Sequence, residues 1–277
     1  MRAIYFSTLL AVFLVPAAKI PTAQTPTPAA QTPAVQSPEA QAAAARYAAA
    51  DIRVLSPGVV YNAGLLDLAA AFTKEGGKKV AVSSDGMGRI VNDVKTATPP
   101  ADVIMLPLEL MSTLTLDNGI KGSYTPLGRV EVGLAVRAGA PHPDISTVEK
   151  FKTAILGAKA VMYSNPAGGS MVGHIADTLV KRPEFAGVHA VISTRGEGGQ
   201  ALARGEGDMA LQLICEILPY KEIELVGPLP RELAAWIDNA TAVSARSMHP
   251  DDALAFIRYI TRPEAAAVWK AKGLNRF

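Results

Sequence analysis

Short apolar runs alternate with amphipathic segments through most of the chain. In the first half, apolar runs of a few residues predict strands, and the segments after them repeat apolar residues at the spacing of a helix. The predicted strands and helices alternate over residues 52–55, 65–72, 79–83, 87–94, 102–105 and 108–116. Three such pairs in succession predict an α/β fold with a parallel, right-handed, doubly wound sheet.

A second series of elements follows a longer predicted strand at 131–136. Further strands are predicted at 160–163, 190–193, 209–213, 223–226 and 240–245, and helices at 148–156, 171–180, 231–237, 250–261, 263–272 and, briefly, from Gly199. No Pro/Gly/Ser-rich linker separates the two series, so we expect two adjacent strands to join them and the last helices to return to the first unit. The expected units are residues 51–130 with 240–277, and residues 131–239.

The first residues predict a secretion signal. Arg2 precedes an apolar run over 4–15, which ends in small residues. This run falls short of the roughly 20 apolar residues that span a bilayer, so a cleavable signal over 1–23 is favoured over a short membrane anchor. The mature protein is then expected in the periplasm and not embedded in the membrane. Residues 24–50 are almost wholly Ala, Pro, Gln and Thr, which predicts a disordered linker, although residues 40–50 have the composition to form helix.

Charge and cysteine usage exclude several classes of protein. The chain has 27 Lys and Arg against 25 Asp and Glu, and loss of Arg2 and Lys19 with the signal makes it formally neutral. Scattered charges without a basic stripe argue against a nucleic-acid partner. The four histidines are far apart in the sequence, so no metal is expected, and no other cofactor is indicated. The lone Cys215 follows a buried run and is interpreted as a core thiol.

Three loops of unusual composition follow the predicted strands at 52–55, 79–83 and 160–163. Ligands of doubly wound sheets bind beyond the carboxyl ends of the strands, where helices begin. Each loop supplies small residues, hydroxyls and unpaired first-turn amides, which hold anions without a lysine. Singly, each loop is explained as a helix cap and a turn, but their shared topological position favours a binding site. The candidate ligand-binding residues in these loops are Ser56, Gly58, Ser84, Asp85, Gly86, Gly169, Ser170 and Met171.

Other polar residues are candidates for the same site. Gln212 lies in an apolar strand, where a buried amide needs partners, and it either braces the backbone at the junction of the units or points into the cleft. Glu216 follows that strand, and His174 falls in the first turns of a helix, either exposed or in contact with the ligand. Arg89 and Arg129 are the cationic candidates, with the ordinary role of solvated surface arginines as the alternative.

One glycine-rich turn superficially matches a dinucleotide-binding fingerprint. Residues 196–201 have the pattern G-x-G-x-x-A after a predicted strand. Glu197 would face the pyrophosphate and the helix that follows is short, so a simple turn between strand and helix is the favoured interpretation. The sequence contains no G-x-S-x-G elbow and no P-loop.

Several segments together resemble the molybdate-binding-protein-like periplasmic solute-binding proteins of ABC importers. They are VLSPGVVYNAGLLDLAAAF, VAVSSDGMGRIVNDV, ADVIMLP, GRVEVGLAVRAGAPHPDIST, YSNPAGGSMVGHIADTL, GEGDMALQLICEILP and ELVGPLP, spread over about 52–277. The resemblance implies the type II periplasmic binding protein fold, in which two α/β lobes joined by two crossover strands enclose a ligand. It also implies a small anionic ligand and a permease in the inner membrane as partner, and we expect a monomer.

The family's oxyanion site matches this chain in part. The resemblance implies a serine in the first loop, here Ser56, a second serine in the loop that here contains Ser84, and backbone amides at 169–171. Asp85 departs from the pattern, because its carboxylate would repel a dianion, and a tyrosine of the family site near residues 213–216 is absent. The expected ligand is a small anion, either a molybdate-like oxyanion or a small organic carboxylate.

A branch of the same superfamily resembles periplasmic aconitate isomerase, which moves an allylic proton of an unsaturated tricarboxylate. This enzymatic alternative needs a base with an adjusted pKa beside the ligand, for which His174, Glu216 and Asp85 are candidates. It also needs cations on the carboxylates, for which Arg89 and Arg129 are candidates. The sequence favours the receptor and keeps the isomerase as the alternative.

Overall fold

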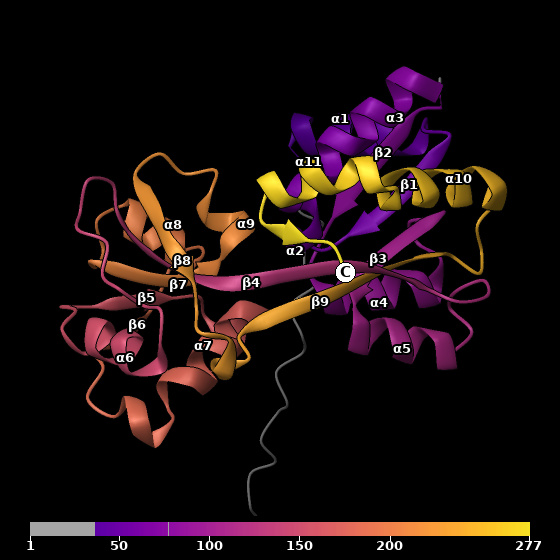
Figure 1. The fold of residues 1–277 in the computed structure, drawn as a ribbon. Coiled ribbons are helices and arrows are strands. Elements are labelled where there is room, and N and C mark those ends of the chain that lie inside the picture. The colour runs from indigo at the N-terminus through magenta and orange to yellow at the C-terminus, as the bar shows by residue number, and fades with distance from the viewer. Residues whose placement is uncertain (1–36, 77) are drawn as a thin grey trace, which may run out of the picture.

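The computed structural model describes residues 37–76 and 78–277. Figure 1 shows two α/β lobes side by side, joined by two long strands, with the C-terminus beside those strands. The two-lobed α/β architecture predicted from the sequence is therefore confirmed. The predicted signal at 1–23 and residues 24–36 of the predicted linker lie outside the described residues.

The first lobe is built on a short parallel sheet with helices on both faces. Its strands are β1 (Ile52–Ser56), β2 (Val80–Ser84) and β3 (Val103–Pro107), in the order β2-β1-β3. Its helices are α1 (Pro38–Ala48), α2 (Gly58–Val60), the π-helical turn Tyr61–Leu65, α3 (Leu66–Gly76), α4 (Met87–Thr96) and α5 (Leu108–Leu116). The register pairs Ser56 with Ser84 at the carboxyl ends of β1 and β2, so the two loops that follow start side by side.

Two antiparallel strands connect the lobes, β4 (Thr125–Arg137) and β9 (Trp236–Val243). β9 pairs with β3, and the first half of β4 pairs with β9, so both strands extend the sheet of the first lobe. The second half of β4 pairs with strands of the second lobe, as Figure 1 shows. One continuous strand therefore belongs to both lobes.

The second lobe has a mixed sheet of its own. Its strands are β5 (Val161–Tyr163), β6 (Ala190–Ile192), β7 (Met209–Leu213) and β8 (Ile223–Pro228). β5 runs parallel to β6 and β7, whereas β4 lies antiparallel between β7 and β8. The helices are α6 (Val148–Leu156), α7 (Met171–Val180), α8 (Gly198–Ala203) and α9 (Ile214–Ile217), with 3-10 turns at Pro166–Gly168, Pro183–Phe185 and Arg231–Leu233.

The C-terminal segment packs on the first lobe. It forms α10 (Pro250–Thr261), a 3-10 turn at Pro263–Ala265, α11 (Ala266–Ala271) and β10 (Leu274–Asn275), which pairs with β4. Phe256 of α10 meets Phe72 of α3 edge to face, with 5.2 Å between the ring centroids. Trp269 of α11 is fully buried, and its indole N–H donates to the Ile260 carbonyl at 2.8 Å. These contacts join the end of the chain to its first helices.

The structure corrects two of the sequence predictions. Residues 38–48 of the predicted linker form α1, where Ser37 caps the helix and the buried Tyr47 hydroxyl donates to the Pro100 carbonyl at 3.1 Å. The helix predicted at 231–237 stops after one 3-10 turn, because Ala234 adopts a left-handed conformation with φ of 51°. β9 then begins at Trp236, ahead of the strand predicted at 240–245.

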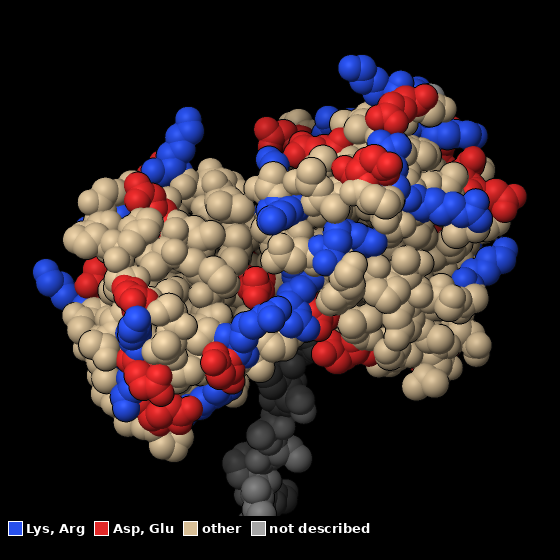
Figure 2. All heavy atoms as spheres, in the orientation of Figure 1, with Lys and Arg blue, Asp and Glu red and all other residues tan. Residues whose placement is uncertain are grey.

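Charged side chains of both signs are interspersed over the face shown in Figure 2, including the region where the lobes meet. The positive charge on this face thus forms no extended stripe. In the part of the chain that the structure describes, no helix is both long and apolar enough to cross a membrane.

Candidate functional site

The three loops singled out in the sequence meet in one cleft between the lobes. The cleft has a volume of about 320 Å³ and is lined by residues 57–59, 84–87 and 168–172 of these loops. Glu197, Leu213, Glu216 and Ile237 complete its lining. The first two loops belong to the first lobe and the third to the second, so a bound ligand would touch both lobes.

Two ten-residue helices from opposite lobes begin at this cleft. Gly86 is the N-cap of α4, and Ser170 is the N-cap of α7. The Ser170 hydroxyl accepts a hydrogen bond from the Gly173 amide at 3.2 Å, which confirms its role as a helix cap. The other first-turn amides of such helices have no carbonyl partner within the helix and carry partial positive charge. The cleft therefore offers two groups of anion-binding amides, one on each lobe.

The side chains of the cleft are acidic. Asp85, Glu197 and Glu216 line it, and no lysine or arginine does so among the described residues. The Asp85 carboxylate accepts a hydrogen bond from the neighbouring Gly86 amide at 2.7 Å, so part of its charge is satisfied locally. Glu197 caps α8 through its side chain and also accepts from the Ser170 hydroxyl at 3.4 Å. Amide donors and carboxylates thus line the same cleft.

Glu216 is a carboxyl group of the cleft with a raised pKa. It lies on α9, and the buried Gln212 side chain of β7 donates to its Oε2. Burial raises the pKa of Glu216 to about 7, the charge of Glu197 adds to this increase, and the Gln212 hydrogen bond partly opposes it. Glu216 is therefore present in both protonated and ionised forms near neutral pH.

Gln212 holds Glu216 within a chain of hydrogen bonds. Its Oε1 accepts from the Ser164 hydroxyl at 3.0 Å, and Ser164 Oγ in turn accepts from the Gly198 amide at 3.1 Å. The chain links β7 to the loop after β5 and to the start of α8. The Gln212 side chain therefore braces the side chains of Ser164 and Glu216, and it lies outside the lining of the cleft itself.

Comparison with known proteins identifies the family. A family model described as "Bacterial extracellular solute-binding protein" matches residues 52–275. The chain belongs to this family. Among curated proteins, an aconitate isomerase of Pseudomonas sp. is 28% identical over 233 residues, which cover 81% of this chain and 87% of the isomerase.

Several solved structures share the fold. The periplasmic molybdate-binding protein of Azotobacter vinelandii superposes with a TM-score of 0.64 at 18% identity, covering 81% of this chain and 98% of that protein. PEB3 with bound L-phospholactate has a TM-score of 0.58 at 16% identity, covering 82% of this chain and 100% of PEB3. A second structure, of PEB3 from Campylobacter jejuni, has a TM-score of 0.59 at 16% identity, covering 82% of this chain and 100% of PEB3.

Five of the candidate residues do not line the cleft of this solute-binding protein: Ser56, Arg89, Arg129, His174 and Gln212. Ser56 is fully buried, and its hydroxyl donates to the Pro57 carbonyl at 3.1 Å. Arg89 projects from α4 with 64% of its side chain exposed and pairs with Asp93. His174 is exposed on α7 and lies outside the lining. The backbone of these loops and helices reaches the cleft, but these side chains point elsewhere.

Arg129 has a structural role in the connecting strands. Its guanidinium makes two hydrogen bonds to Asp238 across β4 and β9, at 2.7 and 2.8 Å, and stacks 3.8 Å above the ring of Trp236. The hydrogen bond to Asp238 raises the pKa of Arg129. These contacts fix the cation between the two strands, outside the lining of the cleft.

The glycine-rich turn before α8 is explained by close packing. A Cβ atom on Gly198 would lie 2.6 Å from the Cα of Tyr163, so only glycine lets the start of α8 approach β5 this closely. The same turn places Glu197 in the cleft, which the sequence analysis missed. The spacing of Glu197 and Gln200 could have indicated this position in the sequence, because it is the spacing of a capping box. In that motif the side chain of each residue accepts a hydrogen bond from the backbone N–H of the other, here at the start of α8.

Cys215 is buried and has no sign of reactivity. Its thiol donates to the Val59 carbonyl at 3.4 Å, and burial raises the pKa of the thiol. The interpretation as a core thiol is thus supported. The described residues contain no cluster of three or more His, Cys, Asp or Glu side chains suited to a metal ion.

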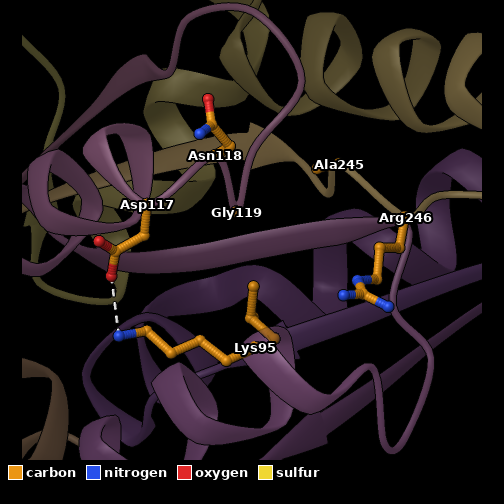
Figure 3. Close-up of a pocket in the computed structure, with 7 residues that line it drawn as sticks. Lys95, Asp117, Asn118, Gly119, Ala245 and Arg246 are labelled. Carbon is orange, nitrogen blue, oxygen red and sulfur yellow. Dashed lines mark ion pairs between the residues drawn. The ribbon is translucent and has the colours of Figure 1, made fainter.

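Another pocket, shown in Figure 3, lies in the first lobe and has a volume of about 370 Å³. Lys95, from the last turn of α4, and Asp117, which caps the end of α5, face each other there with 2.8 Å between Nζ and Oδ2. Helix C-termini carry partial negative charge, and the lysine is already paired. Arg246 also lines this pocket, which lies within one lobe and therefore, unlike the cleft, does not offer donors from both lobes to one ligand.

Proposed function

We propose that the protein is the periplasmic receptor of an ABC-type importer and closes its two lobes on a small organic carboxylate. The observation that carries this proposal is that α4 and α7 begin on opposite lobes and face one cleft. An anion held by both helix starts stabilises the closed arrangement, because each lobe contributes donors only when the lobes are together. The proposed partner is a membrane permease that recognises the closed form.

An organic acid suits the charges of this cleft better than an inorganic dianion. Two unit charges 4 Å apart interact by about 4 kcal/mol at an effective dielectric constant near 20. A compact dianion would meet repulsion of this kind from Asp85 and Glu197, and from Glu216 whenever it is ionised. A carboxylic acid can place its charge at the helix starts and turn its uncharged part toward the glutamates. L-phospholactate, which is bound in the structurally similar PEB3, is likewise an organic acid, and it carries a phosphate in addition to its carboxylate.

The proposed periplasmic location and monomeric state rest on further support. The family is extracellular by its description, and the predicted signal at 1–23 provides the means of export. A single chain contributes both faces of the cleft, so the site needs no second copy.

Calorimetric titration of the purified protein tests the receptor. Molybdate, tungstate, sulfate, acetate, succinate, malate and citrate are added separately at neutral pH. Binding of at least one carboxylate more tightly than molybdate supports the proposal. Tighter binding of molybdate contradicts the organic ligand, and absence of heat with every anion contradicts the receptor for small anions.

A second candidate function is isomerisation of an unsaturated acid. It is favoured by the position of Glu216, a carboxyl group with a pKa of about 7 in the cleft, and by the similarity to the Pseudomonas aconitate isomerase. The Glu216 carboxylate would take a proton from the allylic carbon, the double bond would shift by one position, and the resulting acid would return the proton to the far carbon. Of the earlier candidate bases, Asp85 also lines the cleft and His174 does not.

Incubation of the protein with cis-aconitate separates enzyme from receptor. If the protein is an isomerase, trans-aconitate accumulates and Glu216→Gln abolishes the conversion while cis-aconitate still binds. If no trans isomer forms with the wild-type protein, this isomerase activity is excluded and the receptor remains.

A further inference from the structure

A second, smaller cavity adjoins the cleft. It has a volume of about 150 Å³ and shares two residues with the cleft, Glu197 and Glu216. Its other lining residues are Asn62, Gly199, Gln200, Gln212, Pro219 and Tyr220. Asn62 belongs to the first lobe and the rest to the second, so this side pocket also bridges the lobes. The shared glutamates place it directly next to the proposed carboxylate site.

The polar side chains of this pocket are held in fixed orientations. The Gln200 Nε2 donates to the Tyr220 hydroxyl oxygen at 2.7 Å, and Gln200 Oε1 accepts from the Glu197 amide at 3.0 Å. Because the Tyr220 oxygen already accepts from Gln200, its own proton is left to donate to another group. Gln212 is fixed in the same way between Ser164 and Glu216. Such pre-oriented groups are typical of a binding surface.

The charges of the pocket limit what it can hold. Glu197 and Glu216 stand at its border with the cleft, and no cationic side chain lines it among the residues described. A second carboxylate would therefore be repelled, whereas hydroxyl groups could donate to the glutamates and accept from Tyr220. A volume of 150 Å³ equals the share of about five water molecules in the liquid, which is room for a short hydroxylated chain.

We propose that the side pocket is a specificity subsite for the hydroxylated end of a carboxylic acid whose carboxylate binds at the starts of α4 and α7. The ligand class is then a hydroxylated monocarboxylic acid rather than a simple fatty acid or a dicarboxylic acid. This inference rests on the proposed receptor function, because it takes the position of the carboxylate from it.

Matched six-carbon acids test the subsite by calorimetry with the wild-type protein. Gluconate carries hydroxyls, hexanoate carries none, and adipate carries a second carboxylate in their place. We expect gluconate to bind at least tenfold more tightly than hexanoate and adipate. Equal or tighter binding of hexanoate or adipate overturns the inference, and leaves the receptor proposal intact because a carboxylate still binds.

Tyr220→Phe removes a single hydroxyl from the pocket. It should weaken gluconate binding by about fivefold, the effect of one neutral hydrogen bond, and leave acetate binding unchanged. Tyr259→Phe is the matched control, because its hydroxyl bonds to Glu75 outside the pocket, and it should change neither affinity. Unchanged gluconate binding in Tyr220→Phe overturns the subsite. Failure of all the acids to bind to the wild-type protein contradicts the receptor itself, and the subsite with it.

Discussion

At the scale of single residues, Glu216 is a carboxylic acid whose pKa is raised by burial. Its folded pKa of about 7 lies above the ordinary value of 4.5. Below pH 4.5 the group is protonated in both the folded and the unfolded chain, so it does not affect stability. As the pH rises from 4.5 through 7, the unfolded chain ionises first, and the folded state loses stability relative to it.

Glu216→Gln removes this loss, because glutamine cannot ionise and still offers an oxygen to Gln212. Each pKa unit corresponds to about 1.4 kcal/mol, so the variant should be more stable than the wild type by up to about 3 kcal/mol at pH 8 and equally stable near pH 4.5. Chemical denaturation at the two pH values measures the difference. Glu222→Gln, the same substitution at an exposed position, is the matched control. A variant without added stability at pH 8 would contradict the burial and repulsion assigned to Glu216.

At the scale of elements, the cleft is made by helix starts and not by cationic side chains. Arg89 and Arg129 were candidates for binding the ligand, but Arg89 pairs with Asp93 along α4 and Arg129 with Asp238 across β4 and β9. Single substitutions Arg89→Gln and Arg129→Gln should therefore change the dissociation constant of the bound acid less than about twofold. Arg129→Gln should also lower the unfolding free energy by about 1 kcal/mol or more, because it breaks a bidentate pair whose side chains are mostly buried and removes the stacking on Trp236. A tenfold loss of affinity in either variant, measured by calorimetry, would place that cation at the ligand.

At the scale of the whole molecule, the sequence is a good guide wherever a feature depends on local pattern. The three loops could be predicted because parallel strands end at the same edge of a sheet, and the register of Ser56 with Ser84 shows this for the first two. Helices α6, α7 and α10 begin and end at the predicted residues. Caps and apolar periodicity specify such elements without help from distant contacts.

The sequence analysis did not predict features that depend on packing between distant segments. α1 has few large apolar residues and is held by one buried tyrosine, Tyr47, against a loop fifty residues further along. Glu197 and Tyr220 line the two adjoining cavities only because α8 packs on β5 and β7, and α9 packs on β4, β7 and β8. The positions of Ser56 in the core and of His174 on the surface likewise follow from the fold. Their residue types alone would suit a place in the cleft equally well.

The central claim is that backbone amides of α4 and α7 hold the ligand's carboxylate, and proline substitution at the first helical position tests it. Met87→Pro and Met171→Pro each remove one such N–H at a position where helices accept proline, and the residues before them, Gly86 and Ser170, have the extended conformation that proline requires. Val148→Pro is the control, at the start of α6 outside the cleft.

Calorimetry with the tightest-binding acid should show a loss of affinity of roughly tenfold or more for Met87→Pro and for Met171→Pro, the effect of one hydrogen bond to a charged group. Val148→Pro should bind like the wild type. Affinities within twofold of the wild type for both cleft variants would contradict the account.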